Sequence, residues 1–419
     1  MSFALYLQAV LGLAVFVVLA LPFSSNVRRI NWKLVVVAVA LQFAICILLL
    51  RVPLISDGLA AVNRAVGALG AATREGTSFI YGYLGGGTPP FAVTNPGTLV
   101  TFAFQVLPLV IVMSALSALL WFWRILPLIV RAIAWVFERA LDTRGPAGLA
   151  ATANVFLGQI EAPLLVRPYI ATMTRYELLL LMTAGMATIA GSVMVIYAAM
   201  LGPQFAGILG HLITKSIMSV PAAILFAHVM LPEAAEAAHA KMTEPPRIYE
   251  GAMDAVSRGT SDGLNIYLNI LAILLVLIAF VALLNGALGL LPHPGGAPLT
   301  LERMAGWVFA PIAWLMGVPW SEALTSGSLI GVKTVLNEFI AYLRLADLPP
   351  GALSDRSRLI TIYAVCGFAN ISSIGIQISG IGAMAPERKR DLADLGFRAL
   401  VAATLASTMT GAIVGIVAF

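Results

Sequence analysis

Four short polar stretches interrupt long apolar segments of this sequence, and their side chains can bind a solute or an ion. They are Gln159 and Glu161 in residues 158–161, Thr188 and Ser192 in residues 188–192, the pair Asn337 and Glu338, and Asn370, Ser372 and Ser373 in residues 364–380. Amide, hydroxyl and carboxylate groups cost free energy in an apolar environment unless they line a cavity, meet a partner or hold a ligand. Their donors and acceptors favour a neutral, polyhydroxylated or heterocyclic solute over a strongly charged one.

The composition places these stretches in a membrane. The chain has 419 residues, of which 60% are hydrophobic and 11% charged, and its mean hydropathy is +0.94. Soluble domains are about 45–50% apolar. The apolar segments are about 20 residues long, which suits membrane-spanning helices and not the shorter strands of a barrel. Residues 3–23 have no basic residue before them and no clear cleavage pattern after them, so we expect a retained helix and not a signal peptide.

We therefore predict an all-α polytopic membrane protein with eight transmembrane helices and two re-entrant hairpins. The predicted spans are residues 3–23, 34–50, 99–121, 177–200, 204–231, 264–291, 359–383 and 395–419, and the hairpins are residues 148–170 and 322–345. Two spans, 177–200 and 359–383, are predicted to break at their polar stretches. Residues 51–98 are rich in Gly and Pro, with the glycines at residues 85–87 and the prolines at residues 89–90 marking irregular backbone, and part of this region is predicted to lie along the membrane interface. Residues 123–139 and 307–320 are predicted to lie along the membrane interface.

The order hairpin, broken helix, plain helix occurs twice in this prediction. If the helices alternate in direction, 16 of the 25 Lys and Arg residues fall on the inner side and seven on the outer side, and Lys215 and Lys333 lie at membrane depth. This excess predicts both termini outside and the two units in opposite orientation. Such inverted repeats are typical of secondary transporters.

Several of the polar side chains also have a simpler interpretation. Buried Asn, Gln and Ser often only bridge helices, and Lys333, five residues before Glu338, could only neutralise that carboxylate. Lys215 and His211 are better explained by packing or snorkelling than by solute binding. Carboxylates within the membrane are costly and tend to be functional, which favours Glu161 and Glu338 as site residues.

Four motifs give the chain a family resemblance. They are GQIEAPLLVRPY at 158–169, AGSVMVIYA at 190–198, SEALTSGSLIGVKTVLNEF at 321–339 and CGFANISSIGI at 366–376. They resemble those of the concentrative nucleoside transporters, over about residues 99–419 and more weakly before that. The resemblance implies a transporter of a bacterial inner membrane that moves by an elevator-like mechanism, assembles as a homotrimer, contacts membrane lipid and is not an enzyme.

The resemblance also implies a division of the chain. Residues 1–146 and 232–320 correspond to a scaffold domain, and residues 147–231 and 321–419 to the two repeats of a mobile transport domain, the second with the C-terminal helix. It further implies contacts to a nucleoside and a sodium ion. The base would meet Gln159, Glu161 and Val193; the ribose would meet Glu338, Asn370 and Ser373, with Phe368 nearby; sodium would be bound by the side chains of Asn154 and Thr188 and the backbone carbonyls of Leu157 and Ile189.

One residue departs from the family pattern. Where many relatives have Thr or Ser between the Gln and Glu of the first hairpin, this chain has Ile160. A hydroxyl that could bond the base is replaced by a hydrocarbon. We expect an altered base preference, with the polar contacts of this hairpin left to Gln159 and Glu161.

Other functions stay open from the sequence alone. A proton could replace sodium as the coupling ion, carried by Glu161 or Glu338, because a buried carboxylate can take up a proton in the working pH range. Paired hairpins also occur in channels. An intramembrane enzyme is disfavoured because no Ser–His or Cys–His arrangement, metal-ligand spacing or phosphate-binding loop is evident. The net charge of +5 reflects basic helix ends and does not indicate nucleic-acid binding, and no cofactor is expected.

Overall fold

The structure is a computed structural model that describes residues 3–94, 99–143, 145–202, 204, 205, 207–232, 249–292, 296 and 298–419. Within these ranges the regular secondary structure is helical, and no strand occurs among them. The predicted all-α class is therefore confirmed. Residues 233–248, which belong to the charged stretch between the predicted spans 204–231 and 264–291, lie outside the described residues.

Seven helical segments of the described chain are long and apolar enough to cross a membrane. They are α1 (Phe3–Ala20), α2 (Trp32–Arg51), α4 (Leu109–Phe122) with the short π-helix Phe102–Val106 before it, the pair α9 (Arg175–Ala187) and α10 (Gly191–Leu201), α11 (Ile208–Met230), α12 (Ala252–Leu288) and α18 (Lys389–Val417). The eighth predicted span is formed by α16 (Asp355–Val365) and α17 (Ile371–Met384). Each half alone is too short, at about 1.5 Å per residue, to cross about 30 Å of hydrocarbon.

The two predicted hairpins are built from short helices. Hairpin 1 consists of α6 (Pro146–Ala153), α7 (Glu161–Leu165) and α8 (Arg167–Ile170), and hairpin 2 of α14 (Trp320–Val335) and α15 (Glu338–Ala346). Chain reversal falls at residues 154–160 and 336–337, and the polar stretches expected there extend to Glu161 and Glu338, the first residues of α7 and α15. Both broken spans also break where predicted, after Ala187 and after Val365.

Most of residues 51–94 are helical, and irregular backbone follows where the glycines at residues 85–87 and the prolines at residues 89–90 predicted it. The helix α3 (Pro53–Tyr81) begins with proline in its first turn and continues through four glycines, Gly58, Gly67, Gly70 and Gly76, beside which a Cβ atom would meet nothing. The helix forms through its apolar periodicity despite these glycines, which lie in open space. Irregular backbone begins only at Gly82, where φ is +59°.

Two further helices, α5 (Ile125–Leu141) and α13 (Leu301–Leu315), occupy the regions expected at the interface, and α12 begins twelve residues before its predicted start at residue 264. The early start of α12 has a packing reason. Cβ atoms on Gly259 and Gly263 would lie 2.7 Å from Ala118 and Ile111 of α4, so the two helices approach backbone to backbone. The tight contact with α4 therefore includes the turns that precede the apolar run.

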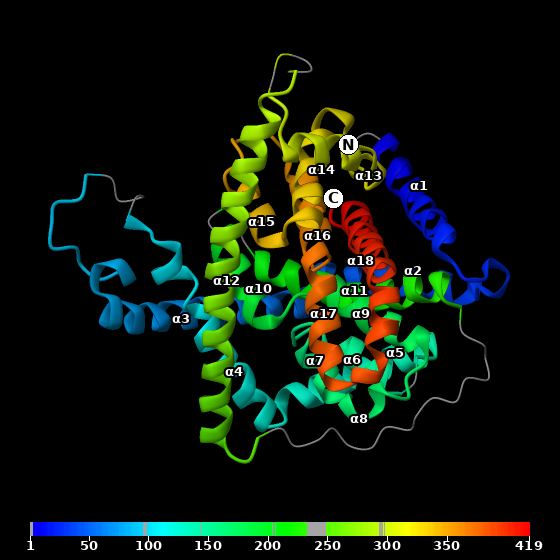
Figure 1. Cartoon of the computed structure of the whole chain (residues 1–419), viewed down its shortest axis with the longest axis horizontal. Helices are drawn as coiled ribbons and strands as arrows, with labels where there is room; N and C mark the ends of the chain where they lie inside the picture. The colour runs from blue at the N-terminus through cyan, green and yellow to red at the C-terminus, as the bar shows by residue number, and fades with distance from the viewer. Residues whose placement is uncertain are drawn as a thin grey trace.

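The core lies among the broken helices and the helices around them. The apolar windows of α9–α10, α11 and α18 are 94%, 89% and 78% buried, against 28% for each of α1, α2 and α4 and 17% for α12. The C-terminal helix α18 packs against α9, α11, α16 and α17, and so joins both repeats. Figure 1 shows α12 along one edge of this bundle, with α3 projecting beyond it.

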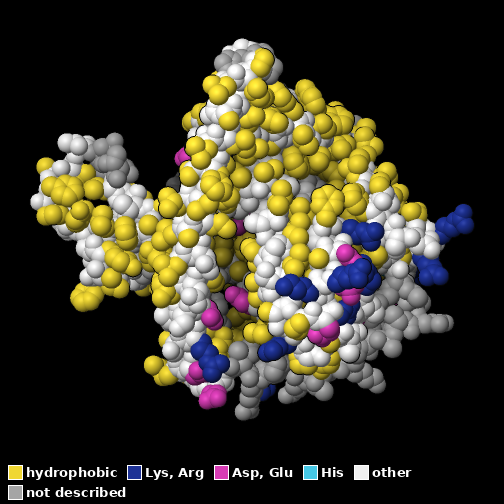
Figure 2. Space-filling model, viewed as in Figure 1, with side chains coloured by type: hydrophobic (Ala, Val, Ile, Leu, Met, Phe, Trp, Pro, Cys, Tyr) yellow, Lys and Arg dark blue, Asp and Glu magenta, His cyan; other side chains and the backbone are white. Residues whose placement is uncertain are grey.

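Charged side chains gather at one end of the bundle. In Figure 2 most Lys and Arg side chains visible on this face lie in its lower half, whereas the upper part is largely hydrophobic. Both termini lie in the upper half of the same view in Figure 1. At the charged end, Arg388 joins the repeats because it donates to the carbonyl of Ile170 at the end of hairpin 1 and to those of Ala171 and Met173 directly after it, and pairs with Asp391 of α18.

Candidate solute and cation site

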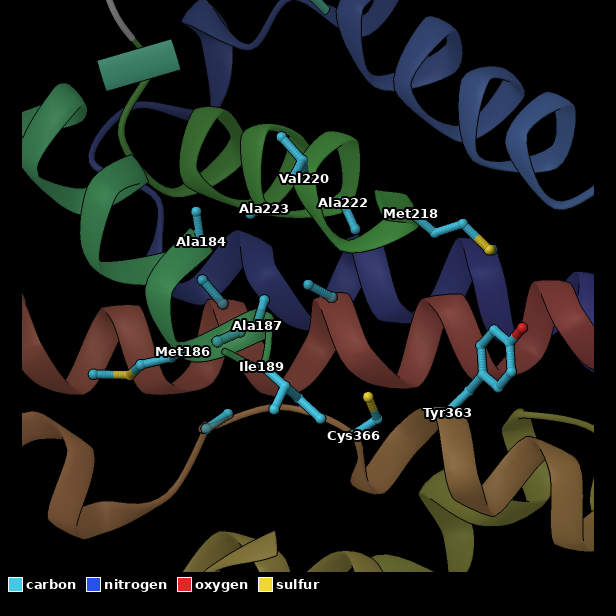
Figure 3. Close-up of a cluster of buried hydrophobic side chains, with 14 of the residues drawn as sticks. Ala184, Met186, Ala187, Ile189, Met218, Val220, Ala222, Ala223, Tyr363 and Cys366 are labelled. Atoms are coloured by element: carbon cyan, nitrogen blue, oxygen red, sulfur yellow. The ribbon is translucent and has the colours of Figure 1, made fainter. Parts of the chain in front are cut away.

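The site begins where the two broken helices cross. The backbone N–H of Phe368, in the break between α16 and α17, donates to the carbonyl of Thr188, in the break between α9 and α10, at 3.3 Å. The N–H of Gly191, at the start of α10, donates to the carbonyl of Phe156 in hairpin 1 at 2.9 Å. Figure 3 shows the crossing, with Ala187 and Ile189 at the end of α9 beside Cys366. Backbone groups released by the breaks thus tie hairpin 1 to the first broken helix, and the first broken helix to the second.

In the second repeat, asparagine residues cap two helices: Asn337 caps α15, the second arm of hairpin 2, and Asn370 caps α17, the second half of the broken helix. The Asn370 side chain accepts from the N–H of Ser373 at 2.9 Å, and Asn337 accepts from the N–H of Ile340 at 2.9 Å. Asn370 precedes α17 and caps it, because an Asn side chain satisfies N–H groups that lack a partner in the first turn.

Glu338, the first residue of α15, is held by two neutral donors. Its carboxylate accepts from the Tyr197 hydroxyl at 2.8 Å and from Asn370 Nδ2 at 3.2 Å, and the residue is 6% exposed. Lys333 is fully buried, and its Nζ has no hydrogen-bond partner among the described residues, so it forms no ion pair with Glu338. The sequence reasoning missed Tyr197, although its position one turn after Val193 could have indicated it.

Gln159 and Ser373, predicted to meet opposite ends of the solute, contact each other directly. Gln159 Nε2 donates to Ser373 Oγ at 3.3 Å, and Gln377 Nε2 donates to Gln159 Oε1 at 3.2 Å and to the Met182 carbonyl at 3.1 Å. The Met182 carbonyl can only accept, so Gln377 must present its nitrogen there and Gln159 must present its oxygen to Gln377. The Gln159 amide nitrogen is left to face Ser373. Gln377 was also missed, although it lies one turn after Ser373.

Glu161 faces a different space. It begins α7, accepts from the Gly158 N–H at 2.8 Å and is exposed to a cavity of about 360 Å³ between hairpin 1, α4 and α12. Ser192, Tyr249 and Asp262 also line this cavity. Glu161 can therefore reach a solute or water from the side of α12, while Glu338 lies deeper in the core.

Three apolar residues surround these polar groups. Val193 is buried in the first turn of α10, and Phe368 is half-buried in the break before α17. Ile160 packs against α17, because a Cβ on Gly380 would lie 2.8 to 3.1 Å from three of its side-chain atoms. The departure at Ile160 therefore fills a contact between hairpin 1 and α17.

The four predicted sodium ligands lie at the ends of α6 and α9. Asn154 follows α6 and is fully buried; its Nδ2 donates to the Ala150 carbonyl at 3.0 Å, and its Oδ1 has no hydrogen-bond partner among the described residues. Thr188 follows α9, and its hydroxyl donates to the Ala184 carbonyl at 2.8 Å, which leaves oxygen lone pairs. The residues directly before Leu157 and Ile189 are Phe156 and Thr188, and the carbonyls of these two already accept backbone hydrogen bonds. Oxygen ligands at the negative, C-terminal ends of helices suit a hard cation such as sodium.

Comparisons with known proteins identify the family. Family models described as "Na+ dependent nucleoside transporter" C-terminus and N-terminus match residues 211–415 and 11–84, and one described as "Nucleoside recognition" matches residues 103–204. The nucleoside permease NupC of Helicobacter pylori is 35% identical over 98% of this chain and 97% of its own. The chain belongs to the concentrative nucleoside transporter family.

Other relatives of the family agree with this assignment. Human solute carrier family 28 member 3 is 34% identical over 97% of this chain, which spans 59% of that longer protein. The structure of CNTnw in an inward-facing substrate-bound state has a TM-score of 0.87 at 35% identity and covers 99% of this chain and 98% of its own. The protein is thus a transporter and not an enzyme, and the likeness extends into the first 98 residues, where the motifs alone are weak.

Proposed function

We propose that this protein is a sodium-coupled importer of nucleosides. The observation that carries the proposal is the direct bond between Gln159 of hairpin 1 and Ser373 of α17, next to a carboxylate that is already oriented by Tyr197 and Asn370. An amide from the first repeat and a hydroxyl from the second repeat meet there, beside that carboxylate. A nucleoside has a flat heterocycle joined to a polyhydroxylated sugar. The Gln159 amide suits the heterocycle, and the Glu338 carboxylate suits the sugar hydroxyls.

The two ends of the solute would meet different groups. The base lies against Gln159, Glu161 and Val193 in this proposal, with the Gln159 amide nitrogen offered as a donor. The ribose hydroxyls donate to Glu338 and exchange hydrogen bonds with Asn370 and Ser373, while Phe368 covers an apolar face. Because the carboxylate is held between two donors before the solute arrives, little reorganisation accompanies binding.

Sodium would bind at Asn154 and Thr188, with the carbonyls of Leu157 and Ile189. The support is the Asn154 Oδ1 atom, a buried acceptor that has no partner among the described residues. An acceptor of this kind costs free energy unless a ligand meets it. A sodium ion at this point would link hairpin 1 to the first broken helix and stabilise the arrangement that the nucleoside also needs.

Transport itself would follow an elevator-like mechanism in a homotrimer of a bacterial inner membrane. In this proposal residues 147–231 and 321–419 move as the transport domain against a scaffold of residues 1–146 and 232–320. The contrast between the buried α9–α10 and α11 and the largely exposed α12 supports it. The exposed apolar face of α12, which includes Leu275, Phe280 and Leu283, suits lipid and neighbouring subunits.

The coupling ion is tested with purified protein in proteoliposomes. Radiolabelled uridine uptake is measured with an inward sodium gradient at equal pH on both sides, and with an inward proton gradient without sodium. Accumulation above the external concentration driven by sodium supports the proposal and excludes a channel. Accumulation driven only by protons would replace sodium with a carboxylate carrier. The candidate is then Glu338, whose partners are neutral donors.

The role of Ile160 in base preference has its own test. Competition among unlabelled nucleosides for uridine uptake is compared in the wild type and Ile160→Thr. We expect the order of preference to change, because threonine adds a hydroxyl to hairpin 1 and removes part of the contact with Gly380. An unchanged order would show that this position does not influence the base.

A further inference from the structure

Lys215 of α11 is a buried cation that the proposed transport cycle does not use. It is 0% exposed, so the snorkelling considered from the sequence is excluded. Its Nζ donates to the carbonyl of Ala187 and to Ser407 Oγ of α18, the latter at 3.4 Å. No ion pair joins it to a carboxylate within the described ranges.

The ammonium lies where the two broken helices meet. Ala187 is the last residue of α9 and directly precedes Thr188. A Cβ on Gly367, in the other break, would lie 3.1 Å from Lys215 Nζ and 2.9 Å from the Ala187 carbonyl oxygen. Lys215 therefore contacts the end of one broken helix and closely approaches the break in the other. The carbonyls that end α9 carry partial negative charge and stabilise a cation there.

A purely structural role does not require a charge at this position. An ionised lysine within the membrane is costly, and a methionine could fill much of the same volume. What the ammonium adds is a strong hydrogen bond to the Ala187 carbonyl. Its two neighbours in the breaks each adjoin a predicted ligand-binding residue, Thr188 for the cation and Phe368 for the nucleoside.

We propose that Lys215 is the positioning residue that couples the cation site to the nucleoside site; this inference rests on the proposed function. A cation that draws in the Thr188 hydroxyl and the Ile189 carbonyl fixes the end of α9. Lys215 holds the Ala187 carbonyl against Gly367, and the Thr188 carbonyl accepts from the Phe368 N–H. The order imposed at the first break thus reaches the residues that meet the ribose. Linkage makes the effect reciprocal.

The test is the coupling factor, defined as the Kd of uridine without sodium divided by the Kd with saturating sodium. It is measured by equilibrium binding to the full-length protein in lipid nanodiscs for the wild type and Lys215→Met. For the wild type we expect a factor of about 5 to 150. For Lys215→Met we expect a factor below about 2, with the Kd without sodium within about threefold of the wild type.

Two other variants make the result specific. Thr214→Ala removes a buried hydroxyl at the neighbouring position, bonded within α11 to the Gly210 carbonyl at 2.8 Å, and is expected to keep the wild-type factor. Ser407→Ala keeps the ammonium but removes one acceptor that holds it. We expect it to lower the factor at least about twofold, and it serves as the test if Lys215→Met does not fold.

The outcomes separate the two proposals. A factor retained in Lys215→Met, or in Ser407→Ala where Lys215→Met does not fold, overturns the coupling role and leaves the proposed function intact. Loss of uridine binding with and without sodium in Lys215→Met also overturns it, because a coupling residue leaves the site itself intact. If sodium does not change uridine affinity in the wild type, sodium coupling fails and the role of Lys215 fails with it.

Discussion

Gln377 offers a sharp test of how the site distinguishes bases. It lies on α17, is fully buried, and donates both to the Met182 carbonyl at 3.1 Å and to Gln159 Oε1 at 3.2 Å. Because the Met182 carbonyl fixes its orientation, Gln377 also fixes that of Gln159, which must offer its N–H groups to the base. The wild type should therefore favour bases with a carbonyl over their amino counterparts, uridine over cytidine and inosine over adenosine.

In Gln377→Leu the Gln159 amide can turn over and present either its oxygen or its nitrogen. The preference then loses the worth of one neutral hydrogen bond, about 0.5–1.5 kcal/mol. This corresponds to a change of about 2- to 12-fold in the ratio of inhibition constants, toward unity. Competition for radiolabelled uridine uptake with the two nucleoside pairs measures it.

A matched control is Gln42→Leu. Gln42 is also a fully buried glutamine, but it lies on α2, and its Nε2 donates to the Ala38 carbonyl at 3.2 Å and to Met409 Sδ of α18 at 3.6 Å, neither of which is a predicted site residue. Its ratios should equal those of the wild type. Ratios in Gln377→Leu within about twofold of the wild type for both pairs would refute the argument that Gln377 orients Gln159.

Two further predictions concern contacts between the repeats. Gly380→Ala should slow uridine uptake severalfold, because its Cβ would lie 2.8 Å from Ile160 Cδ1 and overpacking costs about 1–3 kcal/mol. Adding Ile160→Ala should restore the uptake rate. A rate that is not restored would contradict the importance of this contact. Arg388→Met should lower the melting temperature, since the Nη1 group that contacts the carbonyls of Ile170, Ala171 and Met173 is lost. Nη1 carries two hydrogens, and a charged hydrogen bond contributes about 1.5–3 kcal/mol, less where solvent reaches it. Arg390→Met, at an exposed position, should leave the melting temperature unchanged. An equal shift in both variants would contradict the role of Arg388 in joining the repeats.

The positions of the breaks could be predicted because polar residues inside apolar runs have few explanations in a membrane. The stretches at residues 158–161, 188–192, 337–338 and 370–373 all lie at ends of helices in the structure. The partners of these residues could not be predicted in the same way. Tyr197 and Gln377 lie within regular helices, and only the packing of α10 on α15 and of α17 on α9 shows what they bond.

Two interpretations are incomplete for a common reason. The glycine content of residues 51–98 does not predict the helix α3, and Lys215 is assigned to packing or snorkelling, because each inference uses the residue type without its surroundings. In the structure those glycines lie in open space, and Lys215 meets a carbonyl that is free only because α9 ends at Ala187. The use of a helix end as a partner becomes visible only when the whole fold is assembled.

Asn154→Ala tests the central claim most directly. Uridine accumulation in proteoliposomes is measured with and without an inward sodium gradient for the wild type, Asn154→Ala and the control Thr152→Ala, whose buried hydroxyl is bonded within its helix at 2.9 Å. We predict sodium-driven accumulation in the wild type and in Thr152→Ala, and loss of the sodium dependence in Asn154→Ala. Sodium-driven accumulation retained in Asn154→Ala would contradict a sodium site at the junction of hairpin 1 and the first broken helix.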